Sequence, residues 1–109
     1  MKRPRTFSPV TVEAAQLLGA RVRLARRERR WTLRELADRV GVTSVTMRKV
    51  ERGDPTVGLG VAFEAAAVLG VPLFHEDRAR RSLEAGRVDD RLAVLPQAVR
   101  KPIESDDDF

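Results

Sequence analysis

The sequence of 109 residues predicts an all-α protein built from five helices. Apolar residues recur at spacings of three and four in successive segments, as on the buried face of an amphipathic helix. Threonines precede several of these segments, and glycine or proline follows most of them, as at helix ends. The length suits one compact domain with short tails, which is too small for a large enzyme cleft.

The first helix is expected from residue 12 to about Arg30, with Thr11 as its N-cap. Residues 1–11 contain two prolines and three basic residues and are expected to form a flexible basic arm. One apolar residue in each turn of the helix is expected to face the core: Val12, Ala15, Leu18, Val22 and Ala25.

The second and third helices are expected on the two sides of Gly41. Thr32 and Glu35 have the spacing of a capping box at the start of the second helix. Gly41 ends that helix because glycine accepts the left-handed backbone of a tight turn. Thr43 is expected to cap the third helix, which extends to Arg52. The expected buried residues of the pair are Leu33, Leu36, Ala37, Val40, Met47 and Val50.

Two further helices are expected in the second half of the chain, at about 58–69 and between Glu76 and Leu95. A break near Gly86 is an open alternative for the last one. The expected apolar residues are Leu59, Ala62, Phe63, Ala66 and Leu69 in the first, and Leu83, Val88, Leu92 and Leu95 in the second. We therefore expect a domain over 12–74, a helical extension over 75–95 that is a candidate for dimerisation, and a disordered acidic tail over 96–109.

Residues 32–53 have the pattern of two short helices joined by a tight turn. This pattern is typical of a DNA-reading helix-turn-helix. The alternative is an ordinary helical hairpin. A small residue at Ala37, the glycine at Gly41 and apolar anchors on both helices favour the helix-turn-helix.

The stretch LRELADRVGVTSVTMRKVERGDP, within residues 16–70, resembles the Xre or Cro/C1 family of phage-repressor-like regulators. The resemblance implies a five-helix lambda-repressor-like helix-turn-helix domain with a C-terminal helical extension. It also implies an ion pair between Arg26 and Glu51, which joins the first and third helices. Double-stranded operator DNA, read by a homodimer on paired half-sites, is the implied partner.

On the positions of this sequence, the resemblance implies that the recognition helix carries both kinds of DNA contact. The expected base-contacting residues are Ser44, Val45 and Lys49. Ser44 can bond to either base type, Val45 suits a thymine methyl group, and Lys49 suits guanine. The expected backbone contacts are Thr32, Arg34, Thr43, Thr46, Arg48 and Arg27, with Arg21, Arg23 and Arg30 as weaker candidates. Thr43 as a helix cap alone and Val45 as a half-buried surface residue stay open as alternatives. Leu33 departs from the family, in which a glutamine at this position often contacts a phosphate.

The net charge of +5 is unevenly distributed. Residues 1–53 contain 14 Lys and Arg against 5 Asp and Glu, whereas residues 54–109 contain 7 against 11. The basic half suits a phosphate backbone, and the acidic half suggests a second partner. A solvated, arginine-rich surface is the alternative reading of the same charges.

The run MRKVERGDPTVGLGVAFEAAAVLGVPLF and the later LAVLPQAVRKP resemble HipB-type antitoxins. This resemblance implies a repressor of its own operon that also binds a HipA-like kinase toxin. Partner-binding residues are expected in the tail: Ile103, Asp106, Asp107, Asp108 and Phe109. The alternatives are a tail that only increases solubility and a tail that shields the protein's own basic surface. Candidate dimer contacts are Val71, Leu73, Phe74, Leu83, Val88 and Leu92, and packing within the protein's own core is the alternative for these residues. A stand-alone repressor and a protein-only adaptor are the rival functions.

Catalytic chemistry has little support in the sequence, which has no cysteine and one histidine, His75. We expect no enzyme activity, cofactor or metal. Trp31 is expected to pack between the first two helices. No apolar run approaches the length of about 20 residues that a membrane span needs. The basic N-terminal segment lacks the apolar core of a signal peptide, so a cytoplasmic location is expected.

Overall fold

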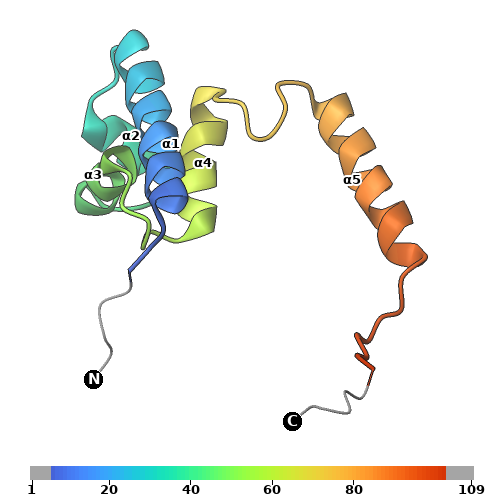
Figure 1. Cartoon of the computed structure of the whole chain (residues 1–109). Helices are drawn as coiled ribbons and strands as arrows, with labels where there is room; N and C mark the ends of the chain where they lie inside the picture. The colour runs from blue at the N-terminus through green and yellow to red at the C-terminus, as the bar shows by residue number, and fades with distance from the viewer. Residues whose placement is uncertain (1–5, 103–109) are drawn as a thin grey trace. The chain divides into compact units, whose positions relative to one another are not determined.

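The computed structural model describes residues 6–102 and is all-α in that range, as predicted (Figure 1). Apart from an isolated bridge between Leu73 and His75, the described residues contain no β structure. The five helices are α1 (Pro9–Glu28), α2 (Leu33–Val40), α3 (Ser44–Arg52), α4 (Leu59–Leu69) and α5 (Arg78–Ala93). The chain divides into two units, one ending at Glu76 with α1–α4 and one beginning at Asp77 with α5.

The start of α1 differs from the prediction. Ser8, not Thr11, is the N-cap, and its Oγ accepts a hydrogen bond from the Thr11 backbone N–H at 3.4 Å. Pro9 occupies the first turn, where its missing N–H leaves no helical hydrogen bond unmade. The helix therefore begins three residues before the expected position, and it ends at Glu28, earlier than Arg30. The first five residues of the expected arm lie outside the described range.

The core lies where α1 and α2 each pack against both α3 and α4 (Figure 1). Val22, Leu36 and Met47 are its largest fully buried side chains. The other buried apolar residues are Ala37, Val50, Ala65, Ala66, Leu69 and Val71. These contacts hold the helix-turn-helix pair in a fixed position on α1 and α4.

The inner face of α4 agrees with the prediction at Ala62, Ala66 and Leu69, which are buried or packed against the core, and differs at the start of the helix. Leu59 was expected in the core, but its side chain is 68% exposed, and Phe63 is only partly buried. Ala65, which was not predicted, is fully buried beside Ala66, and these two small residues let α4 approach the other helices closely. After α4, Val71 is buried and Leu73 packs on the core. These two residues, predicted as dimer contacts, belong to the interior of the domain.

The helix α5 is continuous through Gly86, so the alternative of a break there is wrong. Asp77 caps its start by accepting a hydrogen bond from the Ala79 backbone N–H. None of its residues is buried, and Leu83, Val88 and Leu92 are 57%, 47% and 60% exposed. None of the helices in the described range is long and apolar enough to cross a membrane.

Candidate nucleic-acid interface

Local interactions fix both ends of α2. The predicted capping box is present at the start of α2: the Thr32 backbone N–H donates to Glu35 Oε1 at 2.7 Å, and the Glu35 N–H donates to Thr32 Oγ1 at 3.0 Å. Gly41 ends α2 in the left-handed region, with φ of 89°. The hydrogen bonds from Thr32 stabilise the Glu35 carboxylate and lower its pKa. The capping box and Gly41 therefore define the length of α2, and α3 begins shortly after the turn at Gly41.

Thr43 is the N-cap of α3. Its Oγ1 accepts from the Thr46 backbone N–H at 3.2 Å and also lies 3.2 Å from the Thr46 hydroxyl. The hydroxyls of both threonines are therefore engaged in stabilising the first turn of the helix. A phosphate contact by either residue would have to coexist with this cap.

The outer face of α3 is formed by four exposed side chains: Val45, Arg48, Lys49 and Arg52. They follow the i, i+3, i+4, i+7 spacing of one helix face, so they project in the same general direction. Val45 is 59% exposed, which excludes the alternative of a half-buried residue. Ser44 and Thr46 flank this face and are half-buried. The structure therefore presents one apolar side chain among three cations, with Arg52 as a member that the sequence reasoning did not single out.

The inner face of α3 is anchored by a nearly buried ion pair. Arg26 on α1 donates from Nε to Glu51 Oε2 at 2.7 Å and from Nη2 to Glu51 Oε1 at 3.0 Å. Only 12% of the Arg26 side chain and 7% of the Glu51 side chain are exposed. The hydrogen bonds to Glu51 raise the pKa of Arg26, so its charge is permanent. The resemblance implied this pair, and both residues form it in the structure.

Arg26 has a third contact that ties the loop after α1 to the same anchor. Its Nη1 donates to the Trp31 backbone carbonyl at 2.9 Å. Two guanidinium groups lie over the Trp31 ring, with the Arg39 Cζ 4.0 Å and the Arg29 Cζ 5.3 Å from its centroid. Partly buried against the core, Trp31 has the packing role that the sequence predicted.

The sequence reasoning missed two residues that position these helices. Gly19 on α1 lies so close to α3 that an added Cβ would be 2.7 Å from the Glu51 carbonyl oxygen. Arg29 donates to the carbonyl oxygens of Val68 and Leu69 at 3.2 and 2.8 Å, at the C-terminal end of α4. A glycine within an otherwise regular helix was the available signal for the first residue. Nothing in the spacing pointed to Arg29.

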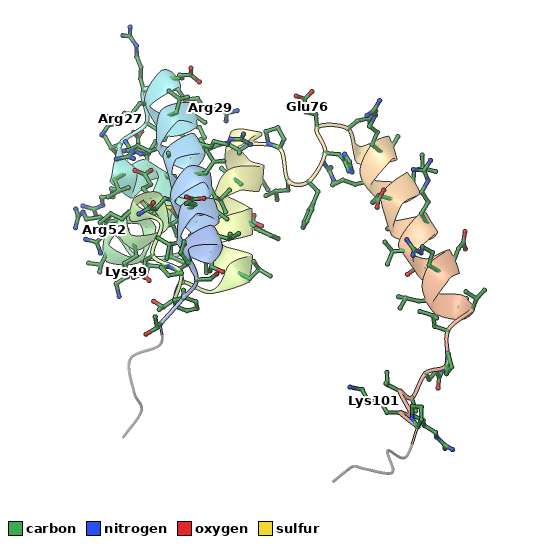
Figure 2. All side chains as sticks on the ribbon, viewed as in Figure 1. Arg27, Arg29, Lys49, Arg52, Glu76 and Lys101 are labelled. Carbon is green, nitrogen blue, oxygen red and sulfur yellow. The ribbon has the colours of Figure 1, made fainter. Side chains whose placement is uncertain are left out.

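Several basic residues of α1 and α3 lie on one side of the first unit. Figure 2 shows Arg27, Lys49 and Arg52 on the same side of the first unit. Arg34, near the start of α2, is exposed as well. Arg21 lies about 120° around α1 from Arg27, since successive helical residues are about 100° apart. It is therefore the arginine of α1 that fits least well with this surface.

A comparison with protein-family models matches residues 17–81 to the family described as Helix-turn-helix domain. The match covers more than half of the chain, so this protein belongs to that family. Searches of curated proteins and of solved structures found no match. Family membership and the exposed basic face of α3 together define a DNA-binding helix-turn-helix regulator.

Proposed function

We propose that this protein is a sequence-specific transcriptional repressor that reads operator DNA with α3. The outer face of α3 carries the proposal, because its side chains match the chemistry of the major groove. Val45 suits a thymine methyl group, Lys49 suits guanine O6 and N7, and Ser44 can bond to either base type. The half-buried position of Ser44 fits a contact at the rim of the groove.

Phosphate contacts are proposed for the residues around this face. Arg27, Arg34 and Arg48 are exposed and carry permanent charges. Thr32 and Thr46 have hydroxyl groups that can donate a hydrogen bond while they accept one. Thr43 would first have to turn the hydroxyl that donates to Thr46 Oγ1. These residues would fix the register of the protein on DNA without reading its sequence.

Selection of binding sequences from a random pool, followed by footprinting, tests the proposal. We expect an enriched motif whose base preferences at one position relax in Lys49→Ala. Recovery of no motif at any salt concentration, although the protein is folded, would leave the protein-only adaptor as the better reading. If the enriched motif were a single half-site with no repeat, this would argue against a protein that binds DNA as a dimer.

We further propose the antitoxin role, in which the protein represses its own operon and binds a HipA-like kinase toxin. The support is the resemblance of the sequence beyond α3 to HipB-type antitoxins and the acidic balance of residues 54–109. The expected contact residues, Ile103 and the segment Asp106 to Phe109, lie outside the described range. We expect the protein to co-purify with a kinase encoded by an adjacent gene. We also expect that complex to be lost when the chain ends at Leu95. A chain that binds its operator but no such kinase would be a stand-alone repressor.

A further inference from the structure

The helix α1 has an exposed apolar stripe on the side that the core does not use. Val10, Leu17 and Leu24 are spaced seven residues apart, which is nearly two helical turns. Their side chains are 73%, 55% and 59% exposed. Three large apolar residues in one row on a domain of this size are more than scattered surface residues, and they indicate an interaction surface.

The stripe is complementary to a second copy of itself. When two α1 helices lie antiparallel with Leu17 on the two-fold axis, Leu17 meets its own copy and Val10 comes level with Leu24 of the other copy. The same register brings Glu13 level with Arg21 of the other copy, on both sides of the axis. Neither Glu13 nor Arg21 forms an ion pair within the described part of the chain. Ala14, beside Glu13, leaves room for the long arginine side chain.

We infer that this protein forms a two-fold dimer through α1, with Leu17 at its centre and Glu13 opposite Arg21. The inference rests on the proposed function, because paired half-sites need a two-fold dimer. It gives Arg21, the arginine that lies away from the α3 side, a role of its own. Leu59, 68% exposed, lines the same hollow as Ala14 and widens the apolar surface.

The contact leaves α3 uncovered. Gly19, which touches α3, lies about 160° around α1 from Leu17, on nearly the opposite side of the helix. The stripe extends over 14 residue steps, which is about 21 Å at 1.5 Å per residue. This is a short contact compared with the interfaces of about 1,200–2,000 Å² that stable complexes bury. The dimer is therefore expected to dissociate on dilution and to be reinforced when both copies bind one operator.

Sedimentation equilibrium of the full chain without DNA tests the inference. The wild type should show a reversible monomer–dimer equilibrium. Leu17→Glu should weaken association by at least about tenfold, because the symmetry places two carboxylates face to face in an apolar contact. Leu83→Glu is the matched control, since Leu83 is 57% exposed on α5, and its dissociation constant should stay near that of the wild type.

Charge reversal gives a second test that does not depend on how well Leu17→Glu folds. Glu13→Arg and Arg21→Glu should each weaken association, and the double variant should restore it, because the opposed pair is then formed with reversed polarity. Any one of three results would overturn the α1 dimer. The wild type could stay monomeric, the dimer could be broken by Leu83→Glu and not by Leu17→Glu, or the double variant could associate no better than the single variants. Since these measurements contain no DNA, specific operator binding by the variants would show that the repressor function stands even where the interface does not.

Discussion

At the residue scale, Lys49 is the side chain of α3 whose contribution to DNA binding can be tested most directly. It is exposed on the outer face, one turn after Val45. We expect Lys49→Ala to weaken specific DNA binding by about 1–3 kcal/mol and to relax the base preference at one position. Affinities for the selected operator and for random DNA, measured at the same salt concentration, check this.

The matched control is Lys101→Ala, which removes the same charge outside the helix-turn-helix. Its affinity for the operator should change much less. An equal loss of affinity for operator and random DNA in Lys49→Ala would mean that Lys49 contacts a phosphate and reads no base.

The ion pair of Arg26 and Glu51 is a residue-scale determinant of stability. Glu51→Ala leaves the Arg26 guanidinium nearly buried, with only the Trp31 carbonyl as an acceptor. We expect a loss of about 3–5 kcal/mol in the free energy of unfolding, measured by urea denaturation. Replacing both residues by leucine should cost less than the single change, because no unpaired charge is then left. A single variant as stable as the wild type would contradict the anchoring role.

At the scale of the element, the ends of α2 and α3 were predictable from sequence because each is a local interaction. Thr32 with Glu35, the left-handed Gly41 and the Thr43 cap each depend on residues within a few positions of one another. The start of α1 was missed although Ser8 and Pro9 give an equally local signal, because Thr11 stands before the first residue of the apolar pattern. The burial of α4 was predicted at Ala62, Ala66 and Leu69. It was missed at Leu59 and Ala65, because which side of an apolar helix faces inward depends on its partners.

Features that depend on contacts between helices could not be predicted from the sequence, unlike the outer face of α3. The outer face of α3 follows from helical spacing alone, and that same spacing includes Arg52. The capping of α4 by Arg29 joins residues about 40 positions apart and has no local pattern. The sequence alone also could not show which of Arg21 and Arg27 lies on the side of α3, because this depends on how α1 packs against its neighbours.

The capping box of α2 gives an expected pH dependence. Because the folded pKa of Glu35 is lowered, the stability from its ionised form is complete above the pKa of the unfolded chain. It is lost as the pH falls from the ordinary glutamate value of about 4.3 through the lower value of the folded state. In Glu35→Gln the amide still accepts from Thr32 but does not titrate. The difference in unfolding free energy between wild type and variant should therefore shift in favour of the variant below about pH 4.

The approach of α1 to α3 is tested by adding one methyl group. Gly19→Ala places a Cβ against the carbonyl oxygens of Val50 and Glu51, which are backbone atoms that cannot rotate away. We expect destabilisation of about 1–3 kcal/mol by overpacking, measured by thermal or urea unfolding. Gly60→Ala is the control, because no atom lies within 4 Å of its added Cβ and alanine favours the helix. Equal stability of the two variants would mean that α1 can move away from α3 at no cost.

At the scale of the whole molecule, the uneven charge distribution predicts how DNA binding depends on salt. Residues 1–53, which include the outer face of α3, hold the excess of basic residues, whereas the remainder is acidic. Each phosphate neutralised by the protein releases condensed counterions, so the logarithm of the affinity should fall linearly with the logarithm of the salt concentration.

We expect Arg27→Ala and Arg34→Ala each to reduce the slope of that line by about one, and to weaken operator and random DNA alike. Arg78→Ala, on α5 and outside the helix-turn-helix, is the comparison variant, and its slope should stay near that of the wild type. Fluorescence anisotropy over a range of salt concentrations measures all four proteins. A slope near zero for the wild type would mean that its arginines are merely solvated, and the protein-only adaptor would then be favoured. A steep slope that every arginine variant shares would place the phosphate contacts on other residues while leaving the DNA-binding role intact.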